Sequence, residues 1–301
     1  MSTPASPAPA RRACFQPRLA RRRLVGRLFA ALCLVAALVA VLVLGSLLWH
    51  VWRQGGNLLS ARFLTSAEST LDPLTSGVLS PLWGTIWLMA LTTVLAVPVG
   101  VAAALYLEEY ATQNRLTRFI GLNIANLAGV PSVVYGLLGL TVFVRWCAFG
   151  RSVLAGGAAL ALLVLPVVII ASREALLAVP KSIREAAYAV GATRWQTIRH
   201  HVLPAALPGI MTGVILALSR AIGEAAPLIV VGAVAYIRAV PSGPFDAFSA
   251  MPIKIFNWSE LAAPEFVRLA GAAILVLLAV LLRMNAVAVG LRAWQQRKKT
   301  W

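Results

Sequence analysis

Long apolar stretches constrain this chain more than any other feature of its sequence. Apolar residues make up 60% of the 301 residues and charged residues only 12%, whereas soluble domains average roughly half and a quarter. A helix needs about 20 residues to cross the hydrocarbon of a bilayer. Six stretches reach this length: 28–51, 81–107, 119–144, 152–172, 205–237 and 266–291. The sequence therefore predicts an all-α integral membrane protein with about six transmembrane helices.

The positions of the basic residues predict the topology. The net charge is +17, and the basic residues gather before the first stretch, between the fourth and fifth, and after the last, as the positive-inside rule expects of cytoplasmic segments. They are Arg11, Arg12, Arg18, Arg21, Arg22, Arg23 and Arg27; Arg173, Lys181, Arg184, Arg194 and Arg199; and Arg292, Arg297, Lys298 and Lys299. Both termini and residues 172–204, the basic loop, are predicted to be cytoplasmic.

Four segments follow from this reading. Residues 1–27 form a mobile basic tail, 28–51 the first transmembrane helix, 80–291 the main transmembrane domain, and 292–301 a basic cytoplasmic C-terminus. A cleaved signal peptide is the alternative for the first helix, but that stretch is long and no small-residue cleavage site follows it closely. We therefore expect an uncleaved anchor.

The basic loop has the pattern of two short helices. Ser182 and Glu185 have capping-box spacing, so a helix is predicted to begin there. One apolar stripe follows, and Gly191 is placed for a left-handed cap. The stripe consists of Ile183, Ala186, Ala187 and Val190. Thr193 and Gln196 form a second predicted capping box.

Signatures of catalysis and of cofactor binding are missing from the sequence. It has no G-x-x-x-x-G-K-[ST] phosphate loop, no HExxH pair and no G-x-S-x-G nucleophile motif. We therefore expect a chain that is not an enzyme, with no metal site and no ATP site of its own.

The basic loop resembles the EAA loop of ABC importer permeases, which docks into a separate ATPase subunit. Glu185-Ala186-Ala187, Gly191 and Leu203-Pro204 match that motif in identity and spacing, although His201 replaces an aliphatic residue. The resemblance implies a type I ABC importer permease architecture. It also implies that Ser182 and the matching residues couple the permease to the ATPase.

Four further runs are similar to PstA-type permeases of phosphate importers: 104–111, 122–140, 220–227 and 252–258. This resemblance implies a second homologous permease subunit, two copies of an ATP-binding subunit that holds ATP and Mg, and a periplasmic phosphate-binding protein. It also implies a location in the inner membrane. Molybdate, sulfate and phosphonate remain alternative substrates, because residue spacing does not separate these oxyanions.

Charged residues inside apolar stretches are expensive, so they are candidates for function. Arg220 and Glu224 lie four residues apart in the fifth stretch, where they form a structural ion pair, line or gate the path, or contact substrate. Pro131 and Tyr135 belong to a cluster in the third stretch that serves helix packing or a kinked path lining. Glu108 and Glu109 are predicted to end a helix in solvent, with contact to the basic loop as the alternative.

Two other classes of function are alternatives to a permease. The two short helices resemble a DNA-binding helix-turn-helix, but both ends of the basic loop are attached to membrane helices and no third helix supports them. A stand-alone secondary transporter or channel would also use intramembrane charges. No inverted repeat is evident between the two halves of the chain.

Overall fold

The computed structural model describes residues 19–69, 76–112, 114–234, 236–237 and 239–297, and every regular element among them is helical. Arg11, Arg12, Arg18, Lys298 and Lys299 lie outside the described residues. The chain divides into two units, residues 1–50 and 51–301. The first unit contains most of α1 (Leu19–Gly55). This helix begins at Leu19, so residues 19–27 belong to α1 and the predicted helix start at residue 28 was wrong. Residues 1–18 of the predicted tail lie outside the described residues.

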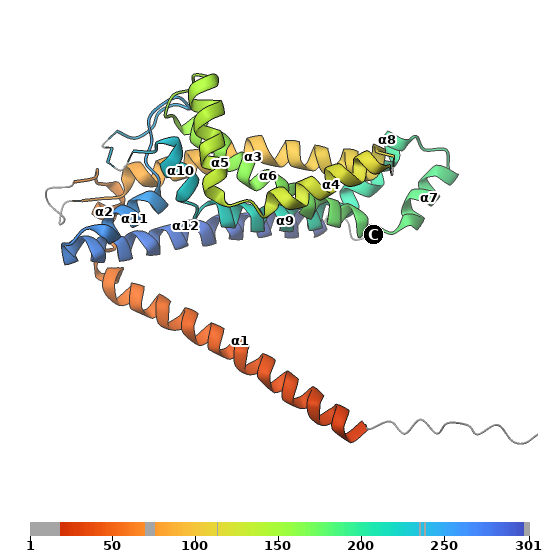
Figure 1. The fold of residues 1–301 in the computed structure, drawn as a ribbon, viewed down its shortest axis with the longest axis horizontal. Coiled ribbons are helices and arrows are strands. Elements are labelled where there is room, and N and C mark those ends of the chain that lie inside the picture. The colour runs from red at the N-terminus through yellow and green to blue at the C-terminus, as the bar shows by residue number, and fades with distance from the viewer. Residues whose placement is uncertain (1–18, 70–75, 113, 235, 238, 298–301) are drawn as a thin grey trace, which may run out of the picture. The chain divides into compact units, whose positions relative to one another are not determined.

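Helices of membrane length dominate the second unit (Figure 1). They are α3 (Leu79–Leu105), α6 (Val153–Leu177), α9 (Leu203–Ala221) and α12 (Pro264–Arg297). In the described part of the chain, five helices including α1 are long and apolar enough to cross a membrane, or six if one bent pair counts as a single span. The predicted all-α membrane fold is confirmed.

Helix α6 forms the centre of the second unit. It packs against both α3 and α9, and its buried side chains are mostly small or aliphatic. Gly156 and Gly157 allow close approach, since a Cβ on them would meet Phe248 and Leu91 within 3.0 Å. Small residues of this kind let the backbones of membrane helices approach closely.

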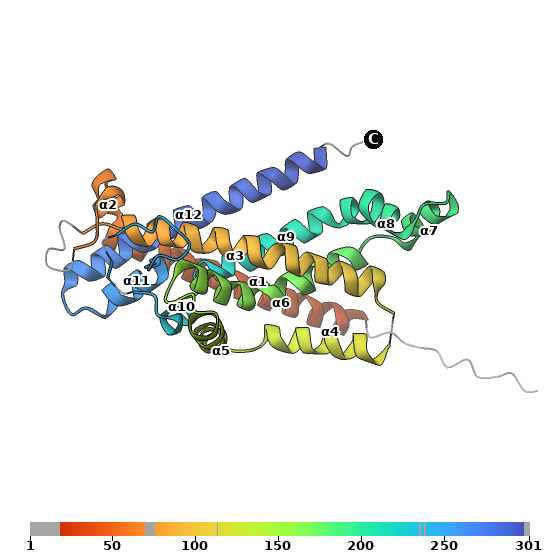
Figure 2. The ribbon, with the colours of Figure 1, turned by 90° about the horizontal axis from the view of Figure 1, so that it is seen from above.

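The third predicted span is not one helix. Helix α4 (Arg115–Ala128) and α5 (Ser132–Gly139), which continues as the π-helix η4 (Leu140–Trp146), meet at an angle of 101°. Figure 2 shows α4 running beside the long helices while α5 is seen end-on. Pro131 explains the break, because proline disfavours helical geometry at the residue before it. The segment 119–144 is therefore not one continuous helix, and it counts as a sixth span only if the bent pair crosses the membrane together.

The fifth predicted span is also interrupted. Helix α9 ends at Ala221, and a turn through Gly223 leads to the short α10 (Ala226–Val231). Pro227 lies in the first turn of α10, where its missing N–H costs no helical hydrogen bond. The expected helix through residue 237 was wrong.

Shorter helices gather at the two ends of the second unit (Figure 1). At one end lie α7 (Lys181–Ala189), α8 (Arg194–Thr197) and the π-helix η5 (Ile198–Val202) of the basic loop. Near the other end lie α2 (Ala61–Thr65), α10 and α11 (Met251–Glu260). A π-helix, η3 (Tyr106–Tyr110), extends α3 toward the basic loop.

Candidate functional site

The basic loop folds as two short helices joined by a turn, as its sequence predicts. Gly191 has a φ of +82° between α7 and α8, a conformation that glycine adopts without steric cost. The Thr193 hydroxyl accepts a hydrogen bond from the Gln196 N–H at 3.3 Å, and the Gln196 side chain accepts one from the Thr193 N–H at 2.8 Å. The second predicted capping box is therefore confirmed.

The first predicted capping box, at Ser182, is absent. Helix α7 begins at Lys181, and Pro180 is its N-cap with a φ of −56° and a ψ of 138°. No side chain caps this end. Because Pro180 already has the extended backbone that an N-cap requires, Ser182 falls inside the first turn. Ser182 and Glu185 are both exposed on α7.

The predicted apolar stripe of α7 is only partly covered. Ala187 is buried and Ile183 is half-buried against the ends of the long helices, whereas Ala186 is exposed and Val190 is 84% exposed. Tyr188 and Trp195 also expose much of their surface. Leu203 and Pro204 are half-buried where α9 begins. The turn between α7 and α8, with Tyr188, Val190 and Trp195 around it, thus presents an apolar surface of the kind that marks an interaction site.

Arg184 anchors α7 to the ends of two long helices. Its Nη2 lies 2.6 Å from Oε1 of Glu109, and the guanidinium also donates to the carbonyl oxygens of Val179 at 2.8 Å and Leu176 at 3.0 Å. The Glu109 side chain is 7% exposed and that of Arg184 19%. Such charge-assisted bonds are stronger than neutral ones.

A second ion pair lies beside the first. Arg173 on α6 donates from Nε to Oε1 of Glu108 at 2.6 Å. The prediction that Glu108 and Glu109 end a helix in solvent was therefore wrong. Both make the contact with the basic loop that was the alternative, Glu108 through Arg173 and Glu109 through Arg184. Sequence spacing gives no signal for either pair, because the partners lie 65 and 75 residues apart.

Tyr110 adds a third contact at this end of α3. The guanidinium carbon of Arg194 lies 5.2 Å from the centre of the Tyr110 ring, a cation–π distance. A cleft of about 450 Å³, lined by both charged and apolar residues, opens between η3 and the basic loop. Its lining includes Glu185, Tyr188 and Lys181.

Arg220 and Glu224 form a loose pair at the break between α9 and α10. Arg220 Nε lies 3.6 Å from Oε1 of Glu224, and the side chain of Arg220 is 62% exposed. Arg220 belongs to the last turn of α9, while Glu224 lies in the turn that follows. The sequence suggested that the two residues lie on one continuous helix. The structure instead places Glu224 beyond the end of α9.

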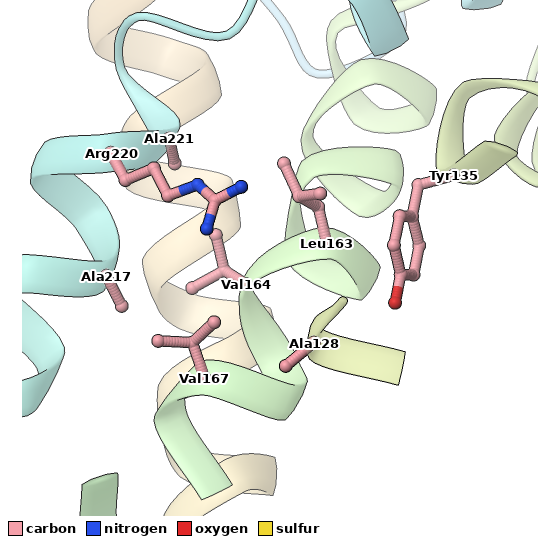
Figure 3. Close-up of a pocket in the computed structure, with 8 residues that line it drawn as sticks. All are labelled: Ala128, Tyr135, Leu163, Val164, Val167, Ala217, Arg220 and Ala221. Carbon is pink, nitrogen blue, oxygen red and sulfur yellow. The ribbon is translucent and has the colours of Figure 1, made fainter. Parts of the chain in front are cut away.

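Arg220 and Tyr135 line the same small cavity of about 10 Å³ (Figure 3). The guanidinium of Arg220 reaches from α9 across Val164 of α6, and the Tyr135 ring lies on the opposite side. The Tyr135 hydroxyl donates to the carbonyl oxygen of Leu127 at 2.7 Å, across the break that Pro131 creates. The structure thus brings Arg220, Pro131 and Tyr135 to neighbouring breaks in two membrane helices.

A buried ion pair lies outside the five candidate spans. Lys254 of α11 pairs with Glu68 from the segment before α3, and the two side chains are 3% and 0% exposed. The ammonium group also lies 4.8 Å from the centre of the Trp258 ring. Burial lowers the pKa of Lys254 to about 8, so the ammonium keeps its charge at neutral pH. No pattern in the sequence linked these residues.

A protein-family model decides the family of the chain. Residues 96–300 match the model of the binding-protein-dependent transport system inner membrane component. The chain belongs to this family of ABC importer permeases. Its members are membrane components of transporters that also contain ATPase and substrate-binding partners.

Curated relatives extend the similarity to nearly the whole chain. The chain is 35% identical over 306 residues to the "Phosphate transport system permease protein PstA 1" of Mycobacterium tuberculosis (strain ATCC 25618 / H37Rv), covering 99% of this chain and 97% of the relative. It is 32% identical to the "Phosphate transport system permease protein PstA" of Yersinia pestis, covering 82% of this chain and 84% of the relative.

Solved structures of importers have the same fold. A chain of a bacterial ABC transporter involved in the import of alginate superposes with a TM-score of 0.64 at 15% identity, covering 94% of this chain and 100% of that one. A chain of the MetNI methionine ABC transporter, in an inward facing conformation, gives a TM-score of 0.53 at 18% identity, with 74% and 97% covered. The permease fold of this family member is therefore that of type I ABC importers.

Proposed function

We propose that this chain is a permease subunit that moves inorganic phosphate across the cytoplasmic membrane by alternating access. The substrate assignment is supported by the similarity to permeases that are named for phosphate transport. One observation carries the importer assignment. The short helices α7 and α8 connect the end of α6 to the start of α9, and they expose an apolar surface.

The basic loop is the coupling element in this proposal. Its exposed residues, among them Glu185, Val190 and Trp195, dock into a cleft of a separate ATPase subunit. Closure of the ATPase pair shifts α7 and α8, and α6 and α9 follow because they continue directly from the basic loop. A rigid-body change of this kind switches access between the two sides of the membrane.

The chain itself is not catalytic in this proposal. ATP and Mg are held by two copies of the ATP-binding subunit, and a second homologous permease completes the path. A periplasmic phosphate-binding protein delivers the substrate. Both termini and the basic loop face the cytoplasm, in agreement with their positive charge.

Arg220, Glu224, Pro131 and Tyr135 line or gate the path. Arg220 lies at the α9/α10 break, and it lines one cavity with Ala128 and Tyr135, which flank the α4/α5 break. Irregular backbone at membrane depth is tolerated where it is buried in protein or lines a cavity. A guanidinium is a permanent donor suited to an oxyanion.

The decisive experiment is uptake by the complete importer in proteoliposomes. We expect ATP-dependent uptake of radiolabelled phosphate that requires the binding protein and resists an excess of molybdate, sulfate or phosphonate. Stronger inhibition by one of these oxyanions than by unlabelled phosphate would reassign the substrate. Uptake that persists without the ATPase subunits would overturn the importer assignment.

A further inference from the structure

We propose that the basic loop drives α3 directly, through Arg184 and the last turn of that helix. The segment concerned, the α3 tip, is the π-helix Tyr106–Tyr110. Movement of α7 then reaches α3 through a side-chain contact, in addition to reaching α6 and α9 through the backbone. This inference rests on the proposed coupling role of the basic loop, and it makes Glu109 and Arg184 positioning residues for transport.

The sequence provides no short connection between these elements. After the α3 tip the chain continues into α4, and α6 follows before the basic loop begins. The basic loop itself leads from α6 into α9. A displacement of α7 therefore acts on α6 and α9 through the chain, but it needs a non-covalent contact to act on α3.

Arg184 supplies that contact with several bonds at once. Two of its nitrogens bond to the Glu109 carboxylate, Nη2 at 2.6 Å and Nε at 3.1 Å from Oε1. The same guanidinium bonds to the carbonyl oxygens of Leu176 and Val179 at the end of α6. One side chain of α7 thus holds the ends of α3 and α6 together, and its planar geometry restricts their relative movement.

Three consecutive residues of the α3 tip each contact a different arginine. Glu108 bonds to Arg173 of α6, Glu109 to Arg184 of α7, and the Tyr110 ring lies against Arg194 of α8. These partners come from three different helices. Single turns of π-helix inside α-helices are frequent at functional sites, and here the wider turn coincides with the residues that reach the basic loop.

Glu108 and Arg173 provide a matched control. This pair also joins an arginine to a glutamate of the α3 tip, and its nitrogen-to-oxygen distance is the same 2.6 Å. It ends on α6, however, and does not reach α7 or α8. Loss of either pair removes one ion pair from the same region, but only loss of the Glu109 pair removes a direct contact with α7.

The test uses the complete importer in proteoliposomes and measures phosphate transported per ATP hydrolysed. For Glu109→Gln and Arg184→Lys we expect this ratio to fall by about five- to tenfold, the lower part of the range for coupling between distant sites. Basal ATP hydrolysis and the amount of assembled complex stay unchanged. Glu108→Gln changes the ratio by less than about twofold, since it leaves the contact with α7 in place.

A distance measurement gives a readout that a purely structural role would not change. Spin labels are placed at Tyr106 of the α3 tip and Ala189 of α7, both exposed in the structure. We expect the distance between them to stay constant when ATP binds to the otherwise native complex, because both elements move together. In Glu109→Gln the distance changes on ATP binding.

The outcomes separate this inference from the proposed function. Absence of ATP-driven phosphate uptake by the unaltered complex overturns the proposed function. Normal uptake with an unchanged transport ratio in Glu109→Gln and Arg184→Lys overturns only the direct drive of α3. If a variant assembles poorly, the labelled native complex decides: a distance that changes on ATP binding overturns the inference.

Discussion

At the scale of single residues, Gly191 restricts the basic loop most. Its φ of +82° lies in the left-handed region, and a Cβ there would meet no atom within 4 Å. The cost of a side chain therefore comes from the backbone alone. For Gly191→Val we expect strain of roughly 1–2 kcal/mol, a misaligned α7 and α8, and less phosphate transported per ATP in the reconstituted importer.

Gly191→Asn is the control, because asparagine tolerates the left-handed conformation better than other residues with a Cβ. We expect its transport ratio to stay close to that of the native chain. Full uptake by Gly191→Val would contradict the coupling role of this turn.

Arg220 and Glu224 allow a second test at this scale. Their loose 3.6 Å contact and the exposure of Arg220 indicate that the pair is not required for folding. We expect Arg220→Glu to lose most phosphate uptake, and the exchange of both charges to leave uptake low, with normal assembly in both. Restored uptake in the exchanged variant would instead assign the two residues to a structural pair.

Local patterns predicted individual residues well only where no competing signal was present. The capping box at Thr193 and the turn at Gly191 depend on neighbouring residues, and both are correct. At Ser182 the same spacing failed because Pro180 caps the helix instead. The contact of Arg184 with Glu109 is set by tertiary packing, which no spacing reports.

At the scale of helices, hydropathy located the membrane segments but not their breaks. The apolar stretch that contains Pro131 continues on both sides of it, as does the stretch around Gly223, so hydropathy alone gives one span in each case. Pro131 allows the break between α4 and α5, but the directions that α5 and α10 take after the breaks depend on how they pack against each other and against α6. That packing is a tertiary property.

The contact of α5 with α10 leads to a prediction. A Cβ at Gly136 would lie 2.8 Å from the Cα of Pro227 and 2.9 Å from the Cβ of Val230. Gly136→Ala should therefore force the two helices apart and cost about 1–3 kcal/mol, as overpacking does. Thermal unfolding of the purified chain in detergent measures this.

Gly129→Ala provides the comparison, since a Cβ there would meet only the carbonyl oxygen of Asn126 at 3.4 Å. We expect its unfolding temperature to remain near that of the native chain. Equal stability of the two variants would show that α5 and α10 do not require close contact.

At the scale of the whole molecule, the pair of Lys254 and Glu68 joins segments that are far apart in the sequence. Both side chains are almost completely buried, so removing one partner leaves the other charge without compensation. We expect Lys254→Met to lower the free energy of unfolding by about 3–5 kcal/mol. Denaturation of the purified chain in detergent checks this value.

The double variant Lys254→Met with Glu68→Gln removes both charges and should recover part of the lost stability, because replacing a whole buried pair is often close to neutral. A double variant that is less stable than Lys254→Met would show that the ion pair is not the reason for the loss.

The bonds of Arg184 also limit how such permeases can be recombined. A basic loop transplanted from a related permease brings its own residue to position 184, while Glu109 remains with the recipient, 75 residues earlier in the chain. A chimaera that exchanges only residues 172–204 therefore keeps both ends of the graft but loses the bond between α7 and α3 wherever the donor lacks an arginine there. Grafts that include Tyr106–Tyr110 of the same donor preserve the match.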